Sequence, residues 1–271
     1  MRRRYRRRHG LPVNQHVEPI PARSTFPRLG WSVLNLVQFA FTLAWTMGCI
    51  TLALLVWAVT GGRRRLPLRM ASWLWAPGLL GGAGARVQVE GQERVDWSKP
   101  YVLVANHQSV IDICALFRAV PVPLHFLLKQ EMERVPFVNW YARAMGMVFS
   151  PREARRAASA SLRRSADAVR AGATLCIFPE GTRSRDGRIG AFKPGAFEVA
   201  IQAGAQVLPV SLEGTGRVLP PEGFFRVRPG PIRVRFGAPL ALEEDGQALT
   251  RQALAARAQA AVEALQRPSR G

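Results

Sequence analysis

Residues 101–112 read Tyr-Val-Leu-Val-Ala-Asn-His-Gln-Ser-Val-Ile-Asp and join an apolar run to two ionisable side chains. The run at 101–105 predicts a buried strand, because short runs of branched apolar residues are typical of sheet interiors. His107 follows that strand directly. In open α/β sheets, residues just beyond the carboxyl end of a strand face the ligand crevice. The sequence therefore predicts a functional site at this end of the strand.

Asp112 lies five residues after His107. Residues five apart in one helix point about 140° apart, so the two side chains can meet only if the helix begins between them. We expect Ser109 to be the N-cap and Asp112 the third helical residue, as in a capping box. The carboxylate would then fix the imidazole tautomer, and the other ring nitrogen could take a proton from a substrate hydroxyl. The alternative is a loop histidine beside a helix cap.

A second cluster, Phe-Pro-Glu-Gly-Thr-Arg-Ser at 178–184, follows a predicted strand at 174–178 and would face the same crevice. Gly181 would let the backbone approach a ligand closely, and Arg183 could grip a phosphate with two hydrogen bonds. Lys129 and Arg152 also follow apolar segments. Cations gathered at strand ends would form an anion pocket; the alternative for each is a solvated surface charge.

Strand and helix patterns alternate after residue 84, which predicts a layered α/β domain with a mixed sheet. The expected strands are 87–91, 101–105, 124–128, 174–178, 207–212 and 232–236. The expected helices are 109–119, 134–145, 153–171, 195–204 and 247–265.

Taken together, these segments resemble the glycerophospholipid acyltransferase family, and the resemblance covers about residues 85–240. The family carries an N-H-x-x-x-x-D block, a block ending in Arg, an F-P-E-G-T-R-S block and an apolar block near a proline. These occur here in family order at 106–112, 146–152, 178–184 and 207–210, with a further similar segment at 129–137.

The resemblance implies O-acyl transfer from acyl-CoA or acyl-carrier protein to the free sn-2 hydroxyl of lysophosphatidic acid, with no cofactor and no metal. It implies that His107 is the general base and Asp112 its orienting partner. Arg152 and Arg183 would bind the acceptor phosphate with help from Lys129. The resemblance also implies that Glu180 and Gly181 shape the acceptor site and that Pro209 helps to form the acyl-donor side. The other implied substrate-binding residues are Asn106, Ser109 and Thr182.

Two points of the chemistry stay open in the sequence. The acceptor could instead be glycerol 3-phosphate or an amino-acid lysolipid such as lyso-ornithine lipid. No oxyanion donor is evident, and we expect a backbone N–H in the loop before Ser109 to serve. A soluble acceptor would make a hydrophobic anchor less necessary.

The N-terminal third predicts a membrane anchor. Residues 31–62 contain no Asp, Glu, Lys, Arg or His, and a helical span needs about 20 apolar residues. Arginines flank the run on both sides, which favours a helix that returns or lies tilted over one clean span. Residues 66–80, with Trp73, Trp75 and Pro77, look interfacial because tryptophan favours the headgroup level of a membrane. We therefore expect a disordered basic tail at 1–30, membrane-anchoring helices (transmembrane or re-entrant) at 31–82 and an acyltransferase domain at 83–271.

The amino-acid composition indicates which binding partners and which cellular compartment to expect. The formal net charge is +20, which implies an anionic partner such as an anionic phospholipid surface or an acidic carrier protein. A membrane-tethered nucleic-acid-binding protein would interleave aromatic with basic residues, a pattern absent from the arginine-rich 153–171. Three cysteines without CxxC spacing argue against a disulfide scaffold. We expect the inner membrane with the site on its cytoplasmic face; a lipid-binding scaffold without catalysis is the remaining alternative.

Overall fold

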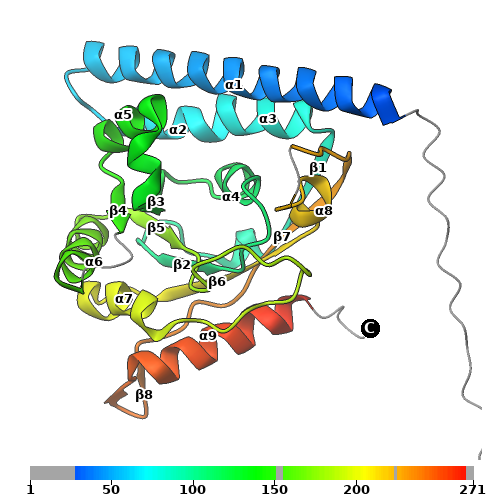
Figure 1. The fold of residues 1–271 in the computed structure, drawn as a ribbon. Coiled ribbons are helices and arrows are strands. Elements are labelled where there is room, and N and C mark those ends of the chain that lie inside the picture. Colours follow the sequence, from blue (N-terminus) through cyan, green and yellow to red (C-terminus); the bar gives the residue numbers. More distant parts are fainter. Residues whose placement is uncertain (1–27, 151–154, 223–224, 267–271) are drawn as a thin grey trace, which may run out of the picture.

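The computed structural model describes residues 28–150, 155–222 and 225–266 (Figure 1). The helices have these bounds: α1 Arg28–Val59, α2 Arg65–Met70, α3 Ala76–Gly82, α4 Asp112–Ala119, α5 Pro136–Met145, α6 Arg155–Arg170, α7 Glu198–Ala203, α8 Thr215–Val218 and α9 Arg251–Gln266. A π-helix, η1, spans Ala71–Trp75, and short 3₁₀ helices are η2 Gln92–Arg94, η3 Gln130–Arg134 and η4 Pro194–Phe197.

Within the described residues, seven strands form one mixed sheet in the order β1-β7-β6-β2-β5-β3-β4. All neighbouring pairs are parallel except β6 with β7. The strands are β1 Ala85–Glu90, β2 Val102–Ala105, β3 Leu124–Lys129, β4 Val148–Ser150, β5 Thr174–Ile177, β6 Val207–Glu213 and β7 Gly230–Phe236, with a separate hairpin of β8 Glu243–Glu244 and β9 Gln247–Ala248. The predicted layered α/β fold with a mixed sheet is confirmed, and the sequence pattern missed β4, β8 and β9. The helix predicted at 247–265 begins instead at Arg251, because residues 247–248 pair with β8.

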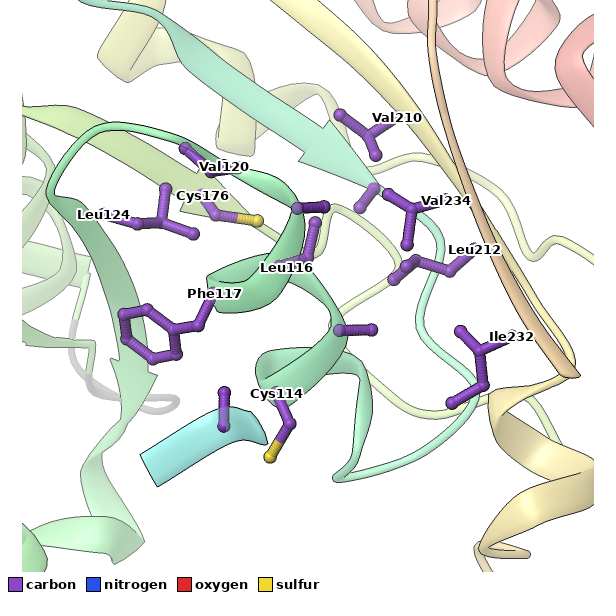
Figure 2. Close-up of a cluster of buried hydrophobic side chains, with 14 of the residues drawn as sticks. Cys114, Leu116, Phe117, Val120, Leu124, Cys176, Val210, Leu212, Ile232 and Val234 are labelled. Carbon is purple, nitrogen blue, oxygen red and sulfur yellow. The ribbon is translucent and has the colours of Figure 1, made fainter. Parts of the chain in front are cut away.

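The central strand β2 is buried on both faces, which is why it carries an unbroken apolar run. Its side chains alternate between two cores. Leu103 joins the cluster that contains α3 and α4, whereas Val102 and Val104 join the cluster that contains α6, α7 and α9. Figure 2 shows the first cluster, where Leu116 of α4 points toward side chains of the neighbouring strands and Cys114 points away from them. The sheet thus holds α4, and with it Asp112, over its carboxyl edge.

The helix α1 is 32 residues long, about 48 Å at 1.5 Å per residue, and exceeds the thickness of a bilayer core. Only 17% of its most apolar window, within Gly30–Val59, is buried, whereas a core helix of a soluble protein would be mostly buried. Its large exposed apolar residues are Val33, Leu34, Leu36, Val37, Phe41, Leu43, Met47, Leu52, Leu55 and Val59. This surface matches the predicted membrane anchor.

The segment predicted to lie at the interface, 66–80, is helical and runs back along α1 (Figure 1). The Trp45 indole donates to the carbonyl of Trp75, and the Trp75 indole donates to Thr46 Oγ1 at 3.1 Å. Gly78 lies against the Trp45 ring so closely that a side chain there would collide with it. The chain from α1 to α3 therefore forms an antiparallel helical pair, in which α3 leads directly into β1.

Candidate active site

The loop after β2 holds His107 against Asp112. The distance from His107 Nδ1 to Asp112 Oδ2 is 2.8 Å, and the Asp112 side chain is fully buried. The same oxygen accepts the backbone N–H groups of Gln108 at 2.7 Å and Ser109 at 2.8 Å. Since a carboxylate only accepts, His107 carries its proton on Nδ1 and presents Nε2 as a base.

The expected capping arrangement is wrong in its starting residue. The helix α4 begins at Asp112, and its N-cap is Ile111. Ser109 is fully buried, and its hydroxyl donates to the Leu219 carbonyl at 2.6 Å. The loop is therefore anchored to the segment after α8, and half of the capping box survives as the Ser109 N–H bond to Asp112.

Glu180 joins the loop after β5 to the loop after β2. Its Oε1 accepts the His107 N–H at 2.7 Å, and its Oε2 accepts the Gly190 N–H at 2.8 Å. The Ser184 N–H donates to the His107 carbonyl at 2.7 Å. Burial raises the pKa of Glu180, against the opposing pull of the two amides. Both backbone groups of His107 are thus fixed by the neighbouring loop.

Phe178, the first residue after β5, stacks on the His107 ring with 4.0 Å between ring centroids and 15° between planes. The ring is therefore held by the carboxylate at one edge and by an aromatic face. Sequence reasoning treated Phe178 only as part of a matching block; its apolar character directly after a strand was the available signal.

A cavity of about 790 Å³ opens at His107 and extends beneath the anchor helices. Most of its wall is apolar and comes from α1, α2, η1, α3, α4 and β3. Cys114 lies in this wall, and burial raises the pKa of its thiol to about 12, which leaves it a poor nucleophile at neutral pH. The polar groups that line the cavity near the loop after β2 and the strand ends include His107, Lys129, Ser150, Arg183 and Lys193.

Of the predicted cations, Lys129 and Arg183 line this cavity, as does Gly181. Arg152 lies outside the described residues. Lys193 was missed: a Cβ added to Gly181 would lie 2.8 Å from the Lys193 Nζ, so the ammonium sits against the glycine backbone. Its position between Phe192 and Pro194, at the start of η4, was the available sequence signal.

Other predicted substrate-binding residues face elsewhere. The Asn106 side chain is buried and bridges β2 to β6, donating to the Leu212 carbonyl at 2.9 Å and accepting the Leu212 N–H at 2.8 Å. Pro209 is buried within β6, and its carbonyl accepts the Gly237 N–H. Thr182 is exposed beside Arg183 and does not line the cavity. We read Asn106, Ser109 and Pro209 as parts of the framework, because their polar atoms are used within the fold.

The expected oxyanion donor, a backbone N–H in the loop before Ser109, is supplied by neither His107 nor Gln108. The N–H of His107 donates to Glu180, and the N–H groups of Gln108 and Ser109 donate to Asp112. The three N–H groups from His107 to Ser109 are therefore all engaged within the fold. The next residue, Val110, is half exposed and lines the cavity.

The His–Asp pair, the loop that braces it and the mixed α/β sheet agree with the acyltransferase domain that the sequence resemblance implied. Residues 86–213 match the family model described as Acyltransferase. This part of the chain is therefore similar to the acyltransferase family, in agreement with the resemblance of the four sequence blocks.

Particular relatives sharpen that assignment. The chain is 36% identical over 156 residues to the chloroplastic 1-acyl-sn-glycerol-3-phosphate acyltransferase LPAT1 of Arabidopsis thaliana. The aligned region covers 57% of this chain and 44% of the relative. The chain is 33% identical over 165 residues to the 1-acyl-sn-glycerol-3-phosphate acyltransferase of Pseudomonas aeruginosa, covering 60% and 63%. The chain thus spans about half the length of several curated relatives.

A solved structure matches over a wider span. The crystal structure of the 1-acyl-sn-glycerophosphate (LPA) acyltransferase PlsC from Thermotoga maritima is similar with a TM-score of 0.74 and 26% identity. The match covers 89% of this chain and 99% of that one. Because so little of the chain is left unmatched, the match includes part of the anchor helices as well as the α/β domain.

Proposed function

We propose that this protein is a membrane-associated 1-acyl-sn-glycerol-3-phosphate O-acyltransferase, which converts lysophosphatidic acid to phosphatidic acid. The observation that carries the proposal is the cavity beside His107. One part of its wall is apolar and the other holds Lys129, Arg183 and Lys193. Such a cavity suits a ligand with one acyl chain and a phosphate. The names of the relatives support the same acceptor.

The proposed step is a direct transfer. His107 Nε2 takes the proton of the sn-2 hydroxyl while the hydroxyl oxygen attacks the thioester carbonyl carbon. The C–O bond forms, the C–S bond breaks, and the thiolate leaves with the proton that His107 has taken. Asp112 holds the ring and stabilises the imidazolium. General-base catalysis of this kind contributes about 10²–10⁴-fold.

Phosphate binding falls to the cationic part of the cavity. Arg183 can form a two-pronged contact with the phosphate, and Lys193 and Lys129 add point charges. We assign Arg152 the same role on the family resemblance. The donor is an acyl thioester, either acyl-CoA or acyl-carrier protein, and no metal or other cofactor enters the step.

We also propose that the protein lies in the inner membrane with this site on the cytoplasmic face. The exposed apolar surface of α1 supports membrane association. The cysteines among the described residues are free, which suits a reducing compartment. An acyl chain dissolved in the bilayer could then enter a cavity whose wall includes α1.

The test is thiol release by the full chain in detergent with long-chain acyl-CoA and lysophosphatidic acid, together with detection of phosphatidic acid. We expect His107→Ala to lower kcat about 10²–10⁴-fold without unfolding the protein. Parallel reactions with acyl-carrier protein, glycerol 3-phosphate and lyso-ornithine lipid identify the preferred substrates. Equal activity of His107→Ala and the unaltered protein would overturn the mechanism, and failure of every donor and acceptor would favour the scaffold.

A further inference from the structure

A second cavity, of about 430 Å³, lies between the anchor helices, β1 and the end of α4. It shares no lining residue with the cavity at His107. Its polar side chains come from α2, η1, η2 and α4, and its apolar wall comes from β1 and the loop after α4. The lining residues are Arg69, Ser72, Trp73, Val87, Val89, Gln92, Arg118, Val120, Pro121 and Val122.

The π-helix η1 divides its residues between the two cavities. Ala71, Leu74 and Trp75 line the cavity at His107, whereas Ser72 and Trp73 line the second cavity. A π-helix widens the turn by one residue and is frequent at functional sites. The anchor segment thus presents an apolar face to one cavity and a polar, aromatic face to the other.

The second cavity has a positive charge that nothing in the described residues neutralises. The Arg69 guanidinium lies over the Trp73 ring, 4.4 Å from its centroid, which leaves the edge of its donor fork for a ligand. Arg118 is exposed at the last turn of α4. The nearby acids are engaged elsewhere: Glu90 contacts Arg235 and Glu93 contacts Arg94. No acid lines this cavity among the described residues.

The position of the cavity indicates where its ligand comes from. The side chains of Leu66 and Trp73 are 47% and 59% exposed. In the sequence they precede and follow Arg69, on the segment that packs along α1. Exposed Trp and Leu beside an apolar helix are typical of the membrane interface, where tryptophan sits at headgroup level. Arg69 would therefore lie at the depth of lipid phosphates.

We propose that this second cavity binds the phosphate headgroup of an anionic bilayer phospholipid. Arg69 and Arg118 would hold the phosphate by charge-assisted hydrogen bonds, with Ser72 and Gln92 as further donors. The wall of Val87, Val89 and residues 120–122 would contact the glycerol and the first methylene groups. This site goes beyond the proposed acyl transfer and is separate from the site of the reacting lipid.

The test measures lipid binding to the full chain in detergent, without any acyl donor. Native mass spectrometry compares phosphatidylglycerol with phosphatidylcholine of the same chains, and inorganic phosphate is the third probe. We expect the double variant Arg69→Gln/Arg118→Gln to weaken phosphatidylglycerol binding about 10-fold or more. The matched control is Arg163→Gln/Arg251→Gln, which removes two exposed charges on α6 and α9, and should change binding less than 2-fold.

Equal weakening by both double variants would overturn the proposal, because it would show attraction to overall charge. Equal binding of phosphatidylcholine, or equally tight binding of free phosphate, would overturn the anionic lipid as the ligand. If the first double variant fails to fold, Ser72→Asp places a negative charge in the same cavity and should abolish the preference for phosphatidylglycerol. The readout needs no catalysis, so it stands or falls separately from acyl transfer.

Discussion

The loops after β2 and β5 lie side by side at one edge of the sheet but differ in how firmly they are held. In the first loop Asn106, Ser109 and Asp112 are buried. The Asn106 amide, the Ser109 hydroxyl and Asp112 Oδ2 are hydrogen-bonded to the backbone, whereas Asp112 Oδ1 has no hydrogen-bond partner among the described residues. In the second loop Glu180 is buried, but Thr182 and Arg183 are exposed. On the proposed function, the comparison teaches that the fold would fix the group for proton transfer, while the group for phosphate binding could adjust to its ligand.

The largest expected effect comes from breaking the fixed loop at Asp112. Asp112 Oδ2 accepts hydrogen bonds from the His107 ring and from the backbone amides of Gln108 and Ser109. In Asp112→Asn, a neutral side-chain amide takes the place of this carboxylate. We expect kcat to fall about 10²–10⁴-fold, because the imidazole loses its tautomer and orientation. Steady-state kinetics over a range of pH measures this. An unchanged kcat would show that the pair is only a helix cap.

The exposed loop should respond in KM instead. We expect Arg183→Gln to raise the KM for lysophosphatidic acid about 10–100-fold with little change in kcat, since a charge-assisted hydrogen bond contributes about 1.5–3 kcal/mol. The matched control is Arg185→Gln, an exposed arginine of the same segment that contacts Glu222 and does not line the cavity. If both variants raise KM alike, the effect is general charge and the assignment of Arg183 is wrong.

A smaller effect should follow from crowding the turn within the loop after β5. Gly181 has φ of +70°, and a Cβ there would lie 2.8 Å from Lys193 Nζ. We expect Gly181→Ala to cost about 1–2 kcal/mol and to lower Tm by about 2–6 °C. Gly195→Ala is the control, because a Cβ at Gly195 meets nothing within 4 Å and its φ is not positive. Equal Tm values for the two variants would contradict this account.

The smallest effect concerns pH. Burial raises the pKa of Glu180, so the folded protein binds the proton of the Glu180 carboxyl group more tightly than the unfolded chain does. The contribution of protonated Glu180 to the free energy of unfolding is therefore present at low pH. It is lost as the pH rises from about 4.3, the ordinary pKa of glutamate in an unfolded chain, through the raised pKa of the folded protein. We expect the Tm of Glu180→Gln, relative to the unaltered protein, to increase over that range. The exposed Glu93→Gln is the control and should show no such trend.

The strands were predictable because their apolar runs have the length and composition that a sheet interior requires. The strand at 101–105 and the one at 207–212 were placed within one residue of β2 and β6. The three-residue β4 was missed because a segment that short has no readable period. The return of α2 and α3 along α1 depends on contacts such as Trp45 with Trp75, which no local pattern encodes.

The site was predictable in its residue types more than in its geometry. The spacing of His107 and Asp112 indicated their contact, and the structure contains it. The brace from Glu180 to the His107 amide joins residues 73 apart, so sequence spacing could not indicate it. The roles of the substrate-binding residues stay predictions, and Arg152 lies outside the described residues.

The anchor helices form part of the wall of the cavity at His107, through residues such as Phe41 and Trp75. A chain shortened to begin at β1 would therefore lose more than its attachment to lipid. It would lose the lining that keeps water from an acyl chain, and it would expose the apolar faces of α4 and β1 that now pack on α3. A water-soluble version would have to keep α1–α3 and replace only their outward-facing apolar residues with polar ones.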